Sequence, residues 1–169
     1  MVRHIFSPLL WLPLAVVLHG RAPAEDTERA VHAVLDDWHR AAAAADEERY
    51  FSHIASDGIF LGTDATEHWT RDEFRAWAKP YFAKGKAWSF RATKRNVTIS
   101  RDGRVAWFDE ALDTPNLGPA RGSGVLVLER AGWQIAQYNL SIPIPNDAFA
   151  EVKRIIEAAE RARKANEQP

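Results

Sequence analysis

Two adjacent carboxylates, Asp109 and Glu110, are the residue types in this chain best suited to acid–base chemistry. They fall in a predicted strand, so their side chains point to opposite faces of a sheet and only one can enter a pocket. Asp109 shares its face with Trp107, whereas Glu110 shares its face with Phe108 and Leu112. A carboxyl group buried among such residues would have a raised pKa, which suits a general acid or base.

A structural interpretation of the same carboxylate is favoured over the catalytic one. Arg121 lies on the adjacent predicted strand, and a buried arginine–carboxylate pair that closes a sheet is a common device. Both interpretations stay open, with Asp109 as the candidate acid–base residue. His39 is a second candidate, because it follows Trp38 at the border of an apolar helical stripe and could turn inward.

A loop and a strand add candidates for ligand binding. The predicted loop before the helix at Arg71 is dense in polar and aromatic residues, and functional residues concentrate in such loops. Six tryptophans follow residue 24, and Trp is often left lining a cavity or an interface. Tyr138 and Asn139 alternate across the last strand, so one of them should face the pocket. The candidate ligand-binding residues are Asp64, Glu67, Trp69, Trp107, Arg121, Tyr138 and Asn139.

Metal and nucleophile chemistry are not predicted. The spacing of His32, Asp36 and His39 would allow metal ligands, but polar residues opposite an apolar stripe usually form a solvated face. Ser123 lies in a strand pattern and lacks the strand-to-helix elbow of serine hydrolases. We therefore expect neither a metal site nor a cofactor.

The N-terminal segment has the layout of a secretory signal. Arg3 and His4 precede an apolar run over residues 5–18, and Ala22-Pro23-Ala24 offers small residues for cleavage. The run is too short to span a hydrocarbon core of about 30 Å. We expect cleavage near Ala24, a periplasmic or secreted location, and no membrane attachment afterwards.

The length and composition of the remaining chain indicate a single domain, and its charge indicates no highly charged partner. Removing Arg3 and Arg21 from the 22 basic residues leaves 20 against 23 acidic ones, a formal charge of −3. This charge gives no reason to propose nucleic acid or an anionic membrane as partner. The chain has no cysteine, so no disulfide supports the fold.

The spacing of apolar residues along the chain predicts which segments are helices and which are strands. We expect a helix from Asp26, a short one from Asp46, a third from Arg71 with a capping box, and a last one from Asn146. The expected strands are 59–62, 88–99, 105–113, 125–129 and 133–142, the last four as consecutive antiparallel neighbours. Both faces of this sheet carry apolar residues while the helices can cover only one, so we expect the other to pack in a homodimer.

Four motifs in this order resemble SnoaL-like domains of the nuclear transport factor 2-like superfamily, of the exported bacterial type, over about residues 27–148. They are Phe60-Leu61-Gly62-Thr63-Asp64 with Glu67 and Trp69, Trp107-Phe108-Asp109-Glu110, Arg121-Gly122-Ser123-Gly124, and Trp133-x-Ile-x-x-Tyr138-x-x-Ser141. The last is also similar to the final strand of the calcium/calmodulin-dependent protein kinase II association domain.

The resemblance implies an α+β fold: a cone-shaped, curved antiparallel sheet with three helices on its concave face, plus a C-terminal helix. It divides the chain into a signal peptide (1–24), a SnoaL-like domain (25–148) and a C-terminal helix and tail (149–169). It implies no single activity, because the superfamily contains isomerases, cyclases, dehydratases, carriers and assembly domains. The leading hypothesis is an exported small-molecule-binding or assembly domain; the alternative is an acid–base isomerase or dehydratase-type lyase.

Overall fold

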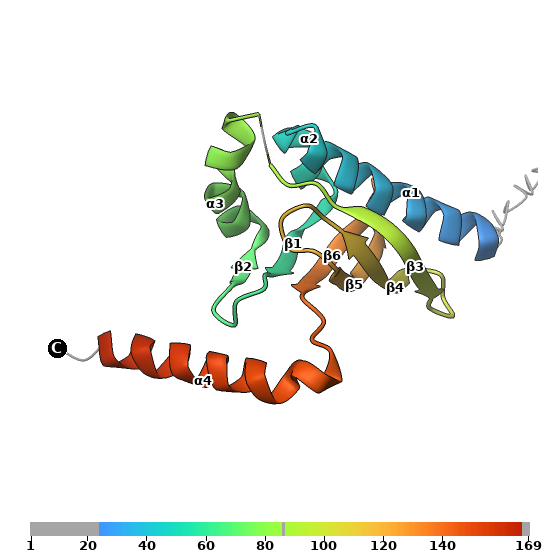
Figure 1. The fold of residues 1–169 in the computed structure, drawn as a ribbon. Coiled ribbons are helices and arrows are strands. Elements are labelled where there is room, and N and C mark those ends of the chain that lie inside the picture. The colour runs from blue at the N-terminus through green and yellow to red at the C-terminus, as the bar shows by residue number, and fades with distance from the viewer. Residues whose placement is uncertain (1–23, 86, 167–169) are drawn as a thin grey trace, which may run out of the picture.

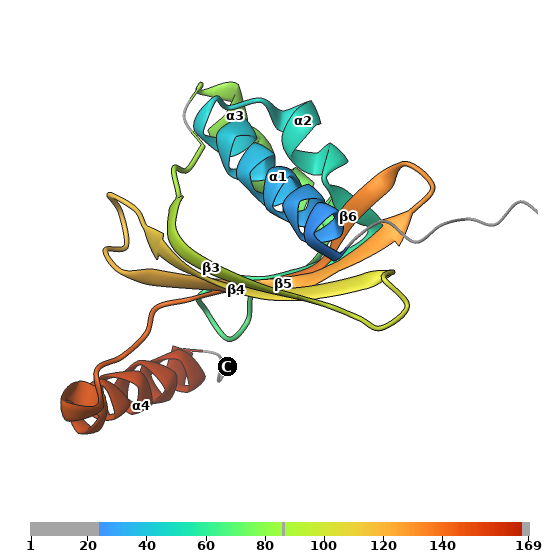
Figure 2. The ribbon, with the colours of Figure 1, turned by 90° about the vertical axis from the view of Figure 1, so that its right-hand side faces the viewer.

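A curved six-stranded sheet organises the chain, and the computed structural model describes residues 24–166 except Lys86. The helices are α1 (Ala24–Ala43), α2 (Glu47–Ser52), α3 (Arg71–Ala83), the 3-10 helix η1 (Asn146–Ala148) and α4 (Phe149–Asn166). The strands are β1 (Ile54–Leu61), β2 (His68–Thr70), β3 (Arg91–Ile99), β4 (Val105–Asp113), β5 (Ala120–Glu129) and β6 (Gly132–Ser141). Helices α1–α3 lie on the concave face (Figures 1 and 2), which confirms the predicted α+β fold.

The strand order is β2-β1-β6-β5-β4-β3. Strands β3 to β6 form consecutive antiparallel pairs, as predicted from their turns. Strand β1 comes from far earlier in the sequence and lies parallel to β6, while the short β2 pairs antiparallel with β1 at the edge. Strand β6, the last of these four consecutive antiparallel strands, therefore lies between β1 and β5 near the middle of the sheet.

The start of β1 corrects the sequence-based assignment. We expected this strand to begin at Ile59, but β1 begins at Ile54. Its first part pairs with β6 across an irregularity between Ile54 and Ile59, and Ile135 N donates to the carbonyl of His53 at 2.8 Å. The partner strand lies more than 70 residues away, so local sequence carries no sign of this pairing. Strand β2 falls within the predicted loop.

The apolar stripe of α1 packs onto the sheet and onto α2. Val31, Leu35 and Trp38 are at most 2% exposed, as the helical period predicts. The Trp38 ring stacks on Tyr50 of α2 with ring centroids 5.0 Å apart and meets Tyr138 of β6 edge-on at 4.6 Å. One side chain thus ties two helices to the central strand.

The two faces of β4 differ sharply in burial. Phe108 and Glu110 point under the helices and are 5% and 0% exposed, whereas Trp107 on the opposite face is 48% exposed. Asp109 is exposed on that same outer face. The alternation fixes which of the two adjacent carboxylates enters the interior, and it is Glu110.

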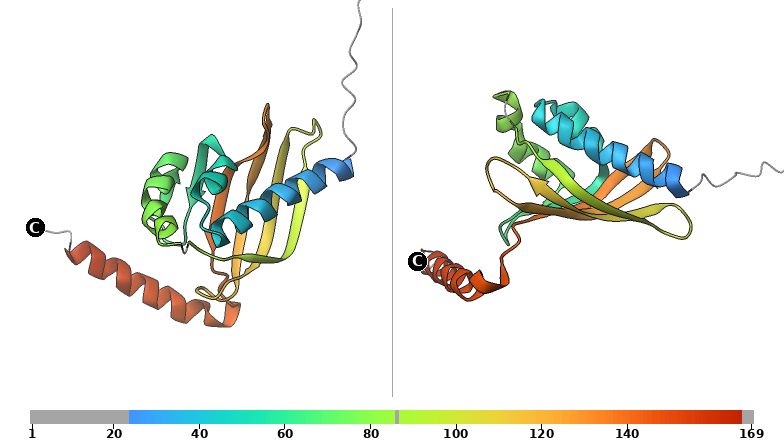
Figure 3. Two further views of the ribbon diagram at one scale, coloured as in Figure 1. Left: turned by 90° about the horizontal axis from the view of Figure 1, so that it is seen from above. Right: turned by 45° about the vertical axis from the view of Figure 1, so that its right-hand side comes forward.

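Helix α4 lies outside the sheet and the helices α1–α3, and its Arg163 approaches Asp64 of the loop before β2 at 3.9 Å. It lies beyond the convex face of the sheet, which the helices α1–α3 leave uncovered (Figures 2 and 3). None of its described side chains is buried, and Phe149 and Ile155 are both 61% exposed. The predicted C-terminal helix is present, preceded by η1 at Asn146.

The predicted export signal lies outside the described residues, apart from Ala24, which begins α1. Within residues 24–166 other than Lys86, no helix has both the length and the apolar character needed to cross a membrane.

Substituting two neighbouring residues of β4 tests the assignment of the faces. Phe108→Ala should lower the free energy of unfolding by about 3–5 kcal/mol, because it empties a buried volume under the helices. Trp107→Ala, on the exposed face, should change it by less than about 0.5 kcal/mol at a protein concentration at which the chain is a monomer. Denaturant unfolding of both variants measures the difference, and equal losses would contradict the observed faces.

Candidate functional site

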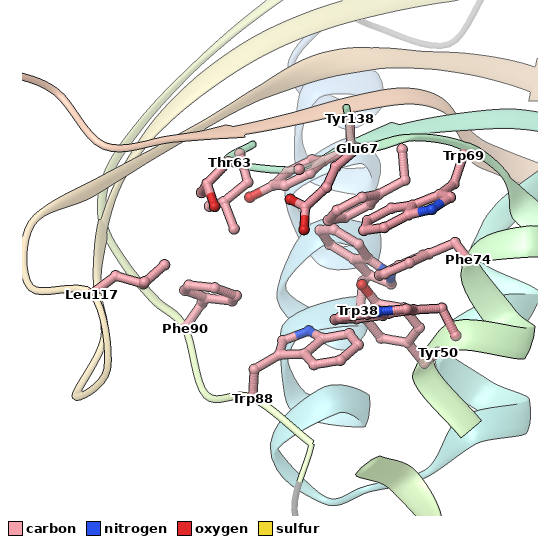
Figure 4. A pocket seen from close by; sticks show the side chains of 14 residues that line it. Trp38, Tyr50, Thr63, Glu67, Trp69, Phe74, Trp88, Phe90, Leu117 and Tyr138 are labelled. Carbon is pink, nitrogen blue, oxygen red and sulfur yellow. The ribbon is translucent and has the colours of Figure 1, made fainter. Parts of the chain in front are cut away.

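A cavity of about 170 Å³ lies between the concave face of the sheet and helices α1–α3. Of the described residues that line it, nine are aromatic and only Glu67 is charged. Figure 4 shows the carboxylate of Glu67 entering between Thr63 and Trp69, with Phe90 and Leu117 on the opposite side. The aromatic residues are Trp38, Tyr50, Phe60, Trp69, Phe74, Trp77, Trp88, Phe90 and Tyr138.

Several of these rings stack on one another, because β1, β2 and α3 follow one another in the chain and lie side by side. Phe60 of β1 stacks on Phe74 of α3 with centroids 3.9 Å apart, and Trp69 of β2 stacks on Trp77 at 5.1 Å. The predicted capping box begins α3 one residue after Trp69: Thr70 N donates to the Glu73 carboxylate at 2.9 Å, and Glu73 N donates to the Thr70 hydroxyl at 3.3 Å. This reciprocal cap fixes the helix against the preceding strand and so places its rings in the wall.

A fully buried carboxylate, that of Glu110, lies behind one wall of the cavity. Its Oε1 accepts hydrogen bonds from His39 Nε2 at 2.7 Å and from the Tyr138 hydroxyl at 3.2 Å. Its Oε2 accepts from Arg95 Nε at 2.8 Å. The cluster joins α1, β3, β4 and β6, and Tyr138 carries it to the edge of the cavity.

The partners of Glu110 keep it ionised. Burial raises the pKa of its carboxyl group, but the hydrogen bonds and positive charges of His39 and Arg95 outweigh burial and hold that pKa below its ordinary value. Burial, together with the negative charge of Glu110, raises the pKa of Tyr138 well above its ordinary value. Glu110 is therefore a fixed charge at neutral pH, and Tyr138 stays protonated and donates to it.

Gly122 leaves the space in which this cluster forms. It lies on β5 directly opposite Glu110, between β4 and β6. A Cβ atom at this position would lie 2.2 Å from the Tyr138 hydroxyl oxygen and 2.9 Å from Glu110 Oε1. A residue with a side chain would collide with both groups, so glycine permits the contact.

Two polar atoms of the cavity wall lack a hydrogen-bond partner among the described residues. They are Trp38 Nε1 and the Tyr50 hydroxyl, on side chains that are 2% and 0% exposed. The indole of Trp88 approaches the Tyr50 hydroxyl but without the geometry of a hydrogen bond. Both atoms are occluded by neighbouring side chains and do not face the open space of the cavity.

A family model describes most of this architecture. The model of the SnoaL-like domain matches residues 31–145, which is more than half of the chain. The chain is a member of the SnoaL-like domain family. The sequence-based resemblance is thereby confirmed, and among curated proteins no sequence matches.

Solved structures share the fold of this SnoaL-like domain at low identity. An NTF2-like protein of unknown function from Pseudomonas putida KT2440 is 14% identical, with a TM-score of 0.63, over 74% of this chain and 92% of that one. A putative dehydratase of the NTF2-like family from Streptomyces avermitilis is 15% identical, with a TM-score of 0.59, over 73% and 100%. A putative calcium/calmodulin dependent protein kinase II association domain from Xanthomonas campestris is 22% identical, with a TM-score of 0.52, over 70% and 88%.

Three of the predicted ligand-binding residues line the cavity of this SnoaL-like domain: Glu67, Trp69 and Tyr138. His39 turns inward as expected and contacts Glu110. Whether any of them binds a ligand stays a prediction. Asp64 lies on the exposed side of its loop, where it accepts from the Thr66 hydroxyl at 2.6 Å.

The register of the sheet places the other predicted residues away from the cavity. All four lie on the outer face of the sheet: Asp109, Trp107, Arg121 and Asn139. Each is next in its strand to a residue that faces the interior, and successive residues of a strand point to opposite faces. Asp109 accepts from Asn96 Nδ2 at 2.9 Å there. None of these four lines the cavity.

The buried arginine–carboxylate pair exists, but with different members from those expected. Glu110 is paired with Arg95 of β3 and not with Arg121 of β5. Because Glu110 alternates in the strand with the apolar residues Phe108 and Leu112, the sequence indicated that its carboxylate would be buried. No comparable signal marked Arg95, because β3 has no clear apolar face in the sequence.

Removing the buried charge should be costly. Glu110→Gln removes the buried carboxylate that pairs with Arg95, whose side chain is 5% exposed, and leaves the guanidinium, among the described residues, only the exposed carboxylate of Asp36 at 2.8 Å. We expect a loss of about 3–5 kcal/mol in the free energy of unfolding, measured by denaturant titration. The matched control is Asp113→Asn, which breaks the exposed pair with Arg91 and should cost less than about 1 kcal/mol.

A double-mutant cycle tests the contact at Gly122. Gly122→Ala should destabilise the protein by about 1–3 kcal/mol because its methyl group meets the Tyr138 hydroxyl. Tyr138→Phe removes that oxygen, so the double variant should lose less stability than the sum of the single variants. Strictly additive losses would show that the two sites do not collide.

Proposed function

We propose that the chain binds a small, mainly apolar organic molecule in the cavity between the sheet and helices α1–α3. The observation that carries the proposal is the cavity itself: a space of about 170 Å³ whose described wall is formed by nine aromatic side chains and a single charged one, Glu67. Ligand pockets lined mainly by apolar and aromatic side chains with a few polar groups suit a ligand whose body is itself apolar.

The cavity volume limits the size of the ligand. A volume of about 170 Å³ is close to the roughly 150 Å³ cavity that accepts benzene, and below the roughly 300 Å³ at which pockets for drug-sized molecules begin. These values favour a ligand with one or two small rings and disfavour a steroid-sized one.

An acid–base enzyme is the second candidate, favoured by one observation. Hydrogen bonds connect Tyr138 at the cavity through Glu110 to His39, which lines a separate surface crevice beside α1. Such a chain is a route for a proton between solvent and the cavity. Against it, the pKa of Glu110 is lowered, and the Tyr138 hydroxyl already donates to Glu110 and so has no proton free for a developing oxyanion.

Location and assembly complete the proposal. The apolar N-terminal segment supports export to the periplasm or beyond, as argued from residues 1–24. The uncovered outer face of the sheet, with Trp107 48% exposed, supports a homodimer through that face.

Blocking the cavity tests the binding function. The probe tert-butylbenzene should raise the thermal midpoint of the wild-type chain and quench its tryptophan fluorescence, because four tryptophans line the cavity. Leu140→Trp, which extends a ring into the cavity, should abolish both effects, whereas Asn139→Trp on the opposite face of β6 should preserve them. Circular dichroism confirms folding of both variants.

Two outcomes would redirect this proposal. Absence of binding to the wild-type chain, together with no ligand detected by native mass spectrometry of protein from its own host, would contradict a binding function. Turnover of a small molecule that stops with Tyr138→Phe but persists with Asp109→Asn would favour the acid–base enzyme.

A further inference from the structure

The cavity has a charge of one sign. Among its described lining residues Glu67 is the sole charged group, and no Lys, Arg or His side chain accompanies it. A second carboxylate, Glu110, accepts a hydrogen bond from Tyr138 and is paired with Arg95 and His39, neither of which lines the cavity. An anionic ligand would therefore meet a carboxylate and no cation in the wall.

Glu67 has no positive partner among the residues that the structure describes. Its Oε2 accepts a single hydrogen bond, from the backbone N–H of Asp64 at 3.1 Å. The nearby guanidinium of Arg163 approaches Asp64 instead, at 3.9 Å. The second oxygen of the Glu67 carboxylate has no donor among the described residues, so it can face a cation held among the aromatic rings of the cavity.

Gly62 holds this carboxylate over the cavity. A Cβ atom on Gly62 would lie 2.1 Å from Glu67 Oε2, so the side chain folds back over the glycine backbone. Gly62 N also donates to the carbonyl of Glu67 at 3.0 Å, which closes the loop. The loop thereby presents the carboxylate of Glu67, a half-buried residue, at the cavity (Figure 4).

We infer that the cavity selects a small organic cation, with its ammonium group at Glu67 and its uncharged body among the aromatic rings. This inference rests on the proposed binding function and adds the charge of the ligand. Aromatic surroundings suit an organic ammonium group, because ring π-electrons attract cations and the groups attached to nitrogen pack against the rings. Glu67 supplies the full opposite charge.

Three probes of nearly the same shape test the charge preference. Trimethylphenylammonium, tert-butylbenzene and benzenesulfonate each place a compact tetrahedral group on one ring and carry charges of +1, 0 and −1. Isothermal titration calorimetry with the full chain should show trimethylphenylammonium binding about tenfold more tightly than tert-butylbenzene. Benzenesulfonate should bind more weakly than both.

Substitution of Glu67 should remove the preference without closing the cavity. Glu67→Gln keeps the size of the side chain and an oxygen for the Asp64 N–H, so tert-butylbenzene affinity should change by less than about twofold, whereas trimethylphenylammonium affinity should fall about fivefold or more. The matched control is Asp109→Asn, the same charge change on the outer face, which should leave both affinities unaltered.

The outcomes separate this inference from the function beneath it. Equal affinity for trimethylphenylammonium and tert-butylbenzene, or tighter binding of benzenesulfonate, would overturn the cation preference while leaving the binding cavity intact. A preference for the cation that survives Glu67→Gln would overturn the assignment of Glu67. Failure of all three probes to bind would contradict the proposed function itself.

Discussion

The interior charge of Glu110 is the constraint on which this fold depends. A buried carboxylate is tolerated only when its oxygens accept hydrogen bonds and an opposite charge lies close by. Here the partners come from three different elements: His39 from α1, Arg95 from β3 and Tyr138 from β6. A shift of β3 or β6 by one residue would turn its partner side chain to the outer face, so the cluster specifies register as well as neutralising charge.

The same cluster shapes the cavity. Tyr138 belongs to both, with its hydroxyl on Glu110 and its ring in the aromatic wall. Tyr138 can make both contacts only because residue 122 is glycine, since a Cβ atom at this position would collide with the Tyr138 hydroxyl. On the opposite wall, the capping box at Thr70 sets the start of α3 and hence the position of Phe74 against Phe60. The wall at Tyr138 is therefore held in place by the hydrogen bond to Glu110, and the wall at Phe74 is held in place by stacking of aromatic rings.

The sequence specified much of this fold but only part of the site. Helical stripes, turn residues and consecutive strands are local patterns, and they predicted α1, α3 and the β3–β6 meander. The parallel pairing of β1 with β6 depends on contacts between distant segments and was not predicted. The choice between Asp109 and Glu110 depended on which face the helices cover, although the apolar neighbours of Glu110 at positions 108 and 112 pointed to it. Arg95 could not be found, because the register that places it opposite Glu110 exists only once β3 and β4 are paired.

Membership of the SnoaL-like family fixes the arrangement of sheet and helices, and the charges within it decide what that arrangement can do. A general base must gain and lose a proton near neutral pH, so a carboxylate that serves this role has a raised pKa. In this chain the buried carboxylate has the opposite property, because His39 and Arg95 stabilise its ionised form. The group that keeps the fold in register is therefore unsuited to moving protons. Among the described residues that line the cavity the one charge is that of Glu67, which lies on a loop outside this cluster and makes no contact with the buried pair of Glu110 and Arg95.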